Sequence, residues 1–263
     1  MAFSQATAAE PIGAHLYRAV LDDGWWVVRG PNGGYVAAVM LRAILAEVAD
    51  PARAPRSLTV HYLAPPAPGP ADIEVTVERS GRSLASVSAR MYQGGKPLVL
   101  ALAALSAPWP GERDFSDAAP PAVAPLEDTV PRPAESLPPI AHRFEFQLGI
   151  GGPPFRAGDE ALTGGWMRLV EPAIVDACVV AALTDAWFPA AFVRLDAPAA
   201  LPTVDLTIHF RAELPLAGAA PDDWSIGIFR SRHARNGFVE EDGEIWSPGG
   251  VLLAQSRQLA LLI

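Results

Sequence analysis

The segment "NGGYVAAVMLRAILAEVA", residues Asn32–Ala49, consists almost entirely of small and apolar side chains. Its length and composition predict an α-helix that opens at the two glycines after Asn32. A helix that is apolar on nearly every side has to be buried on all of them. An antiparallel sheet that curls around one long helix provides that burial, so the segment predicts an α+β fold with a helix at its centre.

The surroundings of this helix occur a second time in the chain. A second segment of the same kind, "PAIVDACVVAALTDAW" (Pro172–Trp187), predicts another helix, with Pro172 in its first turn. Two strands are expected before each helix and several alternating strands after it, with glycine-rich turns between them. The expected later strands are 57–64, 73–79, 83–92 and 98–106 in the first copy, and 204–211, 224–230, 237–245 and 251–262 in the second.

Four pairs of segments also match in the same order along the chain. They are "AHLYRAV" (Ala14–Val20) with "AHRFEFQ" (Ala141–Gln147), "GWWVVRGP" (Gly24–Pro31) with "GGWMRLVEP" (Gly164–Pro172), "SLTVHYLAP" (Ser57–Pro65) with "DLTIHFRAELP" (Asp205–Pro215), and "GGKPLVLALAAL" (Gly94–Leu105) with "GGVLLAQSRQLA" (Gly249–Ala260). Four matches in one order indicate an internal duplication. The segment between the copies is proline-rich and acidic, which predicts an extended linker. We therefore expect an N-terminal unit over residues 1–106, a linker over 107–139 and a C-terminal unit over 140–263.

Composition narrows the class of protein. Half of the 263 residues are hydrophobic, which is typical of a globular chain, and the net charge of −9 argues against a nucleic acid or an anionic membrane as partner. The single cysteine, Cys178, allows no internal disulfide. The start "MAFSQATAAEPIG" does not look like a signal peptide, and the longest apolar run is far shorter than the roughly 20 residues of a membrane span. We expect a cytoplasmic protein without a membrane partner.

The duplicated unit resembles the double-hotdog acyl-CoA thioesterases of the thioesterase II group. The resemblance covers nearly the whole chain apart from the linker, and it rests on the order of elements and segments described above. It implies a double hotdog that hydrolyses acyl-CoA in lipid metabolism without a cofactor, with a non-catalytic N-terminal copy. A double hotdog already imitates a dimer of single hotdog units. We expect this chain to self-associate further, as a homodimer.

If two copies share one scaffold, chemistry is expected where only one copy has polar groups. The second copy carries Asp185, Thr203 and Gln258 where the first carries Arg42, Pro55 and Ala104. The family resemblance selects the same three positions. It implies that Asp185, Thr203 and Gln258 hold a water that attacks the thioester carbonyl, with Asp185 taking the proton. The Thr203 segment, "PTVDLT", departs from the family pattern at Leu206, where the family often has histidine.

Physical arguments apply to two of these residues independently. Asp185 lies late in its expected helix on the face toward the sheet, where the helix dipole disfavours a carboxylate, so it needs a compensating donor. Burial there would raise its pKa, which suits a general base. Strand alternation puts Thr203 on the other face, together with Asp205 and Thr207. Thr203 reaches the helix only if the strand bends at its start; otherwise Asp205 and Thr207 are the candidates.

Two further groups are candidates for binding the substrate. The N–H groups of Gly33 and Gly34, at the start of the first helix, can bind an anion or oxyanion, although a tight turn explains the glycines equally well. Arg230 and Arg232 offer positive charge for the phosphates of coenzyme A, although a solvated outer face is the simpler interpretation. The spacing of His, Cys and Asp does not predict a metal site.

Two alternative functions stay open on the same fold. A hotdog enoyl-CoA hydratase or dehydratase needs an acid/base pair such as Asp with His, and no histidine lies near Asp185 in the sequence. A non-catalytic protein that binds acyl-CoA or an acyl chain would need only the fold.

Overall fold

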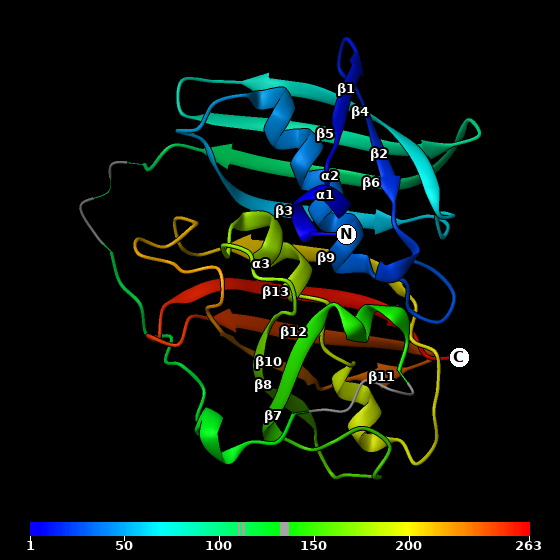
Figure 1. Ribbon diagram of the computed structural model, residues 1–263, viewed down its shortest axis with the longest axis vertical. Coiled ribbons are helices and arrows are strands. Elements are labelled where there is room, and N and C mark those ends of the chain that lie inside the picture. The colour runs from blue at the N-terminus through cyan, green and yellow to red at the C-terminus, as the bar shows by residue number, and fades with distance from the viewer. Residues whose placement is uncertain (110, 112–113, 132–136) are drawn as a thin grey trace.

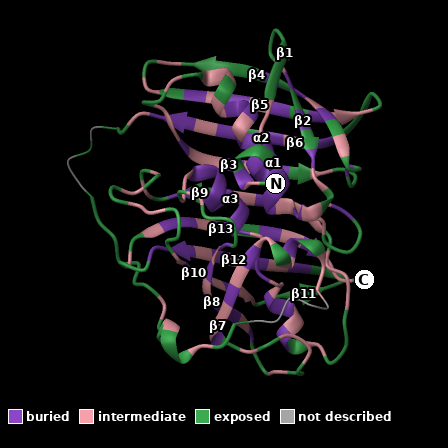
Figure 2. Ribbon diagram, in the orientation of Figure 1, coloured by how far each residue is buried: buried purple, intermediate pink, exposed green. Residues whose placement is uncertain are grey.

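The computed structural model describes residues 1–109, 111, 114–131 and 137–263. Within these residues, thirteen strands form one sheet, and the two principal helices, α2 (Gly33–Val48) and α3 (Ala177–Leu183), lie side by side against it (Figure 1). The helices and the sheet face toward them are buried, whereas the outer loops and turns are exposed (Figure 2). The main core is therefore the layer between sheet and helices, and a smaller cluster of Ile150, Ile226 and Trp246 lies apart from it.

The elements of the two halves follow the same order. The first half contains α1 (Phe3–Ala6), β1 (Glu10–Gly13), β2 (Leu16–Leu21), η1 (Asp23–Trp25), α2, β3 (Ala54–Tyr62), β4 (Gly69–Ser80), β5 (Leu84–Gln93) and β6 (Lys96–Ser106). The rest contains η2 (Leu126–Asp128), η3 (Pro139–His142), β7 (Phe144–Gly151), β8 (Ala161–Leu169), α3, η4 (Ala190–Arg194), β9 (Thr203–Phe210), β10 (Ser225–Ser231), β11 (Ala234–Arg235), β12 (Phe238–Trp246) and β13 (Leu252–Leu261).

The sheet has a two-fold symmetric strand order. The order is β1-β2-β4-β5-β6-β3-β9-β13-β12-β10-β8-β7, with the short β11 paired to β12. From either edge, the same succession of strands leads to the centre, where β3 and β9 pair antiparallel. Each half is thus one sheet around one helix, and the expected double-hotdog α+β fold is confirmed.

Strand pairing at the centre tests the segment matches. Thr59 pairs with Thr207, and the register is symmetric about this pair, because Ser57 pairs with His209 and His61 pairs with Asp205. The match of Ser57–Pro65 with Asp205–Pro215 is therefore correct. The first match is wrong. It sets β2 against β7, whereas the topology makes β8 the counterpart of β2. The second is wrong as well, because Gly24–Pro31 contains no strand while its partner lies largely in β8.

The helices and the last strands correct two residue equivalences. Counted from the residues that cap each helix, Asn32 and Asp176, the counterpart of Asp185 is Leu41 and not Arg42. By strand register, the counterpart of Gln258 is Ala103 and not Ala104, since the two residues pair with equivalent positions of β3 and β9. Both corrected counterparts are buried and apolar.

The second helix is shorter than its sequence suggests. It begins at Ala177, after the Asp176 cap, so Pro172 lies outside it. Its last residue is Leu183, so Asp185 lies in the turn that follows and not in the last helical turn. By contrast, α2 begins and ends as predicted, with Asn32 as its N-cap.

The segment 107–139, predicted as an extended linker, packs against the second half over part of its length. Residues 110, 112–113 and 132–136 of this expected linker lie outside the described residues. Its later part contacts the edge strand β7: the N–H of Ala124 donates to the carbonyl of Gly149, and the Thr129 hydroxyl donates to Gln147 Oε1. This contact covers a strand edge that would otherwise be free to pair. The division at residues 106 and 140 stays a prediction.

Candidate functional site

The start of α2 and the turn after α3 meet at the junction of the two halves. Asp185 Oδ2 accepts hydrogen bonds from the Gly34 N–H at 3.0 Å and from Asn32 Nδ2 at 3.0 Å. The same Asn32 amide donates to the Asp185 carbonyl at 2.6 Å, while Asn32 Oδ1 caps α2 by accepting from the Tyr35 N–H. Asn32 and Gly34, two of the donors that Asp185 needs, therefore come from the first half of the chain, and the positive end of α2 offsets its charge.

The two glycines of "NGGY" allow this approach. A Cβ added to Gly34 would lie 2.5 Å from the Ala182 carbonyl oxygen, and one added to Gly33 would lie 2.9 Å from Asp185 Oδ2. The Gly33 carbonyl accepts a hydrogen bond from the Tyr62 hydroxyl at 2.7 Å. The anion that the first turn of α2 binds is thus the Asp185 carboxylate. A direct contact of Gly33 or Gly34 with substrate stays a prediction.

The surroundings of Asp185 favour its neutral form more than water does. Burial raises the pKa of Asp185 to about 6, and hydrogen bonds from Gly34, Gln258, Gly33 and Asn32 keep it from rising further. A carboxyl group with this pKa is largely ionised at neutral pH and still close enough in pKa to exchange a proton readily. Such a pKa suits a general base, and that Asp185 acts as one stays a prediction.

Thr203 reaches the inner face because β9 is irregular at its start. Leu259 pairs with Asp205, but the next residue, Ala260, pairs with Thr203, so Val204 is an extra residue in β9. Such a bulge reverses the alternation of side chains before it. This is the bend that the sequence required, and it brings the Thr203 hydroxyl to Gln258 Oε1 at 3.0 Å. Thr207 instead contacts Thr59 at the centre of the sheet.

Gln258 connects Thr203 to a second buried carboxyl group. Its side chain is 6% exposed, and its Nε2 donates to Glu241 Oε1 at 2.8 Å. Its amide also lowers the pKa of Asp185 as a hydrogen-bond donor, which is consistent with the two N–H groups that an amide carries. The structure thus brings Asp185, Thr203 and Gln258 together from three different elements.

Glu241 was not among the residues selected from the sequence. It lies opposite Gln258 in the pairing of β12 with β13, is 6% exposed, and accepts from the Ala190 N–H at 2.5 Å. Burial, with the nearby charges of Asp185 and Glu240, raises the pKa of Glu241 to about 7. A signal existed in the sequence, because Glu241 occupies a position that alternates with Val239, Gly243 and Ile245 on the buried face.

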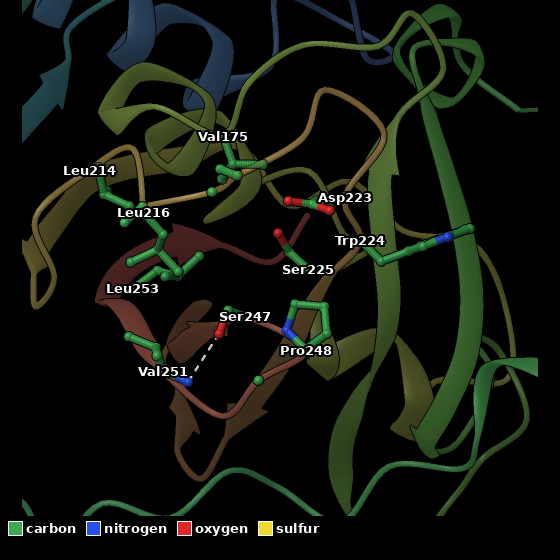
Figure 3. A pocket seen from close by; sticks show the side chains of 14 residues that line it. Val175, Leu214, Leu216, Asp223, Trp224, Ser225, Ser247, Pro248, Val251 and Leu253 are labelled. Atoms are coloured by element: carbon green, nitrogen blue, oxygen red, sulfur yellow. Dashed lines mark hydrogen bonds between the residues drawn. The ribbon is translucent and has the colours of Figure 1, made fainter.

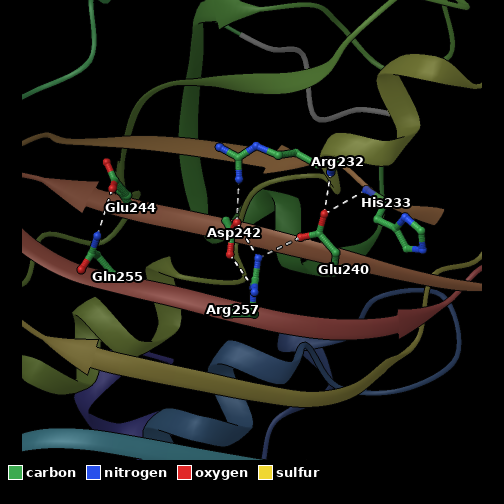
Figure 4. Close-up of polar contacts among 7 residues, drawn as sticks. All are labelled: Arg232, His233, Glu240, Asp242, Glu244, Gln255 and Arg257. Atoms are coloured by element: carbon green, nitrogen blue, oxygen red, sulfur yellow. Dashed lines mark hydrogen bonds and ion pairs between the residues drawn. The ribbon is translucent and has the colours of Figure 1, made fainter.

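Arg230 and Arg232 lie away from this site. Arg230 alternates with the buried Phe229 on β10, which puts it on the outer face of the sheet. Arg232 donates to Asp242 Oδ2 at 3.0 Å within an outer-surface cluster that includes Arg257 and Glu240 (Figure 4). The structure therefore does not bring either arginine to Asp185, and their contact with coenzyme A stays a prediction.

A pocket of about 280 Å³ lies at the opposite end of α3. It is lined mainly by residues of the segment before α3, of the loop between β9 and β10, and near the ends of β12 and β13, among them the apolar Val175, Leu216 and Leu253 (Figure 3). Asp185, Thr203 and Gln258 are not in its lining. This pocket is separate from the candidate site.

The fold places the chain among double-hotdog proteins, and comparison with known families is more specific. Residues 22–106 match the family model described as acyl-CoA thioesterase N-terminal domain, and residues 116–262 match acyl-CoA thioesterase C-terminal domain. The chain therefore belongs to the acyl-CoA thioesterase family.

Solved structures and one curated relative agree with this family. A hot dog fold protein of unknown function from Alicyclobacillus acidocaldarius is 29% identical with a TM-score of 0.91, over 100% of this chain and 98% of that one. A protein from Thermobifida fusca named as a candidate thioesterase II is 25% identical with a TM-score of 0.86, over 99% and 97%. The thioesterase-like protein TwmA of Talaromyces wortmannii is 36% identical over 95 residues, which is 35% of this chain and 27% of that protein.

More distant structures bear on the fold alone. Acyl-CoA thioesterase II TesB2 of Mycobacterium marinum is 20% identical with a TM-score of 0.79, over 100% of this chain and 98% of that one. The dehydratase domain of RzxB from Pseudomonas fluorescens is 15% identical with a TM-score of 0.59, over 93% of each chain. In the part of the chain that the structure describes, we find no helix with the length and apolar character needed to cross a membrane.

Proposed function

We propose that this protein hydrolyses the thioester of acyl-CoA, using a water held by Asp185, Thr203 and Gln258. The observation that carries the proposal is the buried Asp185 carboxylate, which the first turn of α2 holds in place beside the hydrogen-bonded pair of Thr203 and Gln258. Membership of the acyl-CoA thioesterase family supports the choice of substrate class. The partners of the carboxylate are an amide and a backbone N–H rather than a histidine, which favours hydrolysis over hydration of a double bond.

In the proposed reaction, the water gives one proton to Asp185 as its oxygen attacks the thioester carbonyl carbon. The new C–O bond converts the carbonyl oxygen to an oxyanion. When this intermediate collapses, the C–S bond breaks, and the leaving thiolate takes the proton back from Asp185. The Thr203 hydroxyl donates its hydrogen bond to Gln258 Oε1, so its oxygen lone pairs are free to accept a hydrogen bond from the water. The products are the free acid and coenzyme A, with no covalent acyl-enzyme.

The test is a series of acyl-CoA substrates of graded chain length, with the released thiol trapped and measured. The wild-type protein should release thiol with at least one chain length. Asp185→Asn should lower kcat by about 10²–10⁴-fold, because general-base catalysis typically contributes that much. The matched control is Asp176→Asn, since Asp176 caps α3 as Asn32 caps α2, and an asparagine there keeps the cap.

The two ways of failing separate the parts of the proposal. If the wild-type protein releases no thiol with any chain length, the proposed activity is wrong. If Asp185→Asn hydrolyses acyl-CoA within threefold of wild type, the activity stands and the assignment of the site is wrong. The same preparation, run by analytical ultracentrifugation, tests the homodimer that we retain as part of the proposal.

A further inference from the structure

The side-chain amide of Gln258 can face its neighbours in two ways. Turned by 180°, it would exchange its carbonyl oxygen and its NH₂ group, so its surroundings have to decide between the two orientations. In the structure, Oε1 accepts from Thr203 and Nε2 donates to Glu241. A threonine hydroxyl can donate or accept, so Thr203 does not choose the orientation. An ionised Glu241 can only accept, and it therefore requires the NH₂ group to face it.

Both oxygens of the Glu241 carboxyl group accept hydrogen bonds. The Ala190 N–H, at the start of η4, donates to Glu241 Oε2, so the carboxyl group is fixed at both oxygens. Glu240 and Asp242, its neighbours on β12, belong to the outer-surface cluster (Figure 4). Glu241 is buried and points inward. The equivalent position in the first half, by strand register, is Val87, so the fold itself does not require a carboxyl group there.

We propose that Glu241 is a positioning residue that sets the orientation of the Gln258 amide and thereby the direction of the hydrogen bonds around the nucleophilic water. With Glu241 ionised, the NH₂ group gives one N–H to Glu241 and leaves the other for Asp185 or its water. The carbonyl oxygen then takes the Thr203 proton, which leaves Thr203 to accept from the water. Only the kinetic consequence of this inference rests on the proposed thioester hydrolysis.

Protonation of Glu241 should weaken its preference for one orientation of the Gln258 amide, because a neutral carboxyl group can donate a hydrogen bond as well as accept one. Burial raises the pKa of Glu241 to about 7, and the charged groups that add to this effect are Asp185, from the turn after α3, and Glu240, on its own strand. The groups facing it from β13 and η4 are the Gln258 amide and the Ala190 N–H. The orientation of Gln258 should therefore change with pH near neutrality.

The kinetic test compares Glu241→Val, which introduces the residue of the equivalent position, with Glu241→Gln, which keeps one of the two acceptors. We expect Glu241→Val to lower kcat at least tenfold with KM within threefold of wild type, and Glu241→Gln to lie between them. The control is Glu244→Gln, because Glu244 pairs with Gln255 as Glu241 pairs with Gln258, but on the outer face (Figure 4). A kcat of Glu241→Val within twofold of wild type would overturn the inference.

A second measurement is independent of activity. The side-chain ¹⁵N–¹H resonances of Gln258, assigned with Gln258→Ala, are followed from pH 5 to 9 in Asp185→Asn, where Glu241 is the remaining inner carboxyl group of the pair. We expect them to titrate, to stop titrating when Glu241→Gln is added, and to titrate still when Glu244→Gln is added instead. Resonances that do not move with pH, or that move equally without Glu241, sink the inference. Absence of thiol release from wild type would instead count against the proposed function alone.

Discussion

At the junction of the two halves a similar arrangement of strands and helices occurs twice, once around Asp185, in the turn after α3, and once around Leu41, within α2. In both versions the cap of one helix contacts the chain of the other: Asn32 contacts Asp185 just after α3, and Asp176 contacts Arg42 in the middle of α2. Both also have a bulge at the start of the central strand. Their side chains differ throughout. The polar version has Asp185, Thr203, Gln258, Glu241 and Tyr62 where the other has Leu41, Pro55, Ala103, Val87 and Phe210.

The comparison separates what the fold needs from what the site needs. The apolar version shows that the sheet, the bulge and the helix contact form without any polar side chain at these positions. Burying two carboxyl groups close together costs stability, and the raised pKa values of Asp185 and Glu241 are a sign of that cost. Groups that the fold does not require, and that it holds at a cost, are best explained by chemistry.

The strongest test of this difference between the two halves replaces the side-chain amide of Gln258. Gln258→Ala introduces the residue of the equivalent position but leaves Glu241 without its donor and Thr203 without its acceptor. We expect kcat to fall by about 10²-fold, because the water is no longer oriented. The free energy of unfolding should fall by about 1–3 kcal/mol, the cost of unpaired buried polar groups. Thiol release and urea unfolding measure the two effects.

The reverse exchange, Ala103→Gln, is the control for that experiment. It places an amide at the position equivalent to Gln258, where the counterparts of Glu241 and Thr203 are Val87 and Pro55, which offer no side-chain partner. The free energy of unfolding should fall by about 3 kcal/mol, from overpacking and an unpaired amide, while kcat of the folded protein stays near wild type. A loss of kcat as large as that of Gln258→Ala would mean that the two halves are not chemically distinct.

The second prediction concerns how the polar version responds to pH. In the folded protein the pKa values of Asp185 and Glu241, about 6 and about 7, lie above their ordinary values of 3.8 and 4.5. The folded state therefore binds more protons than the unfolded state in the window from about pH 4 to 7, and these two groups destabilise the protein as the pH rises through it. Each should contribute on the order of 3 kcal/mol once it is fully ionised.

Asp185→Asn/Glu241→Gln removes both groups and provides the measurement. Urea unfolding at pH 5 and pH 8 should show that the double variant gains stability relative to wild type as the pH rises. The difference between the two proteins isolates these groups from the many surface carboxylates that titrate in both. A difference that is the same at pH 5 and pH 8 would contradict the raised pKa values.

Comparison of the halves also explains what the sequence could and could not predict. The apolar pattern of Gly33–Val48 sufficed for the first helix, and the strands after each helix follow the expected alternation, so the double hotdog could be predicted. The strand–helix segments before α2 and α3 could not be aligned from short apolar matches, because many such matches are equally good. The shorter α3 was missed because the cap at Asp176 lies inside an otherwise continuous apolar run.

The site was predictable only where one copy differs visibly from the other. Asp185, Thr203 and Gln258 stand out as polar residues opposite apolar or unlike ones, although the equivalences of Asp185 and Gln258 were each one residue out. Glu241 was hidden among the acidic residues of "VEEDGE", where only the strand register separates the inward carboxyl group from the outward ones. Asn32 acts through a contact with the other half, which the linear sequence does not contain.

The smallest expected effect comes from the outer face of the same strands. Arg232→Gln removes a guanidinium that is 60% exposed and paired with Asp242, so its loss should change the free energy of unfolding by less than about 1 kcal/mol. Because Arg232 lies on the opposite face of the sheet from Asp185, kcat and the KM for acyl-CoA should both stay within twofold of wild type. An increase in KM of threefold or more, lost at high salt, would show that this cluster binds the phosphates of coenzyme A. The polar half would then differ from its counterpart on both faces of the sheet, and the comparison would have to include the outer surface.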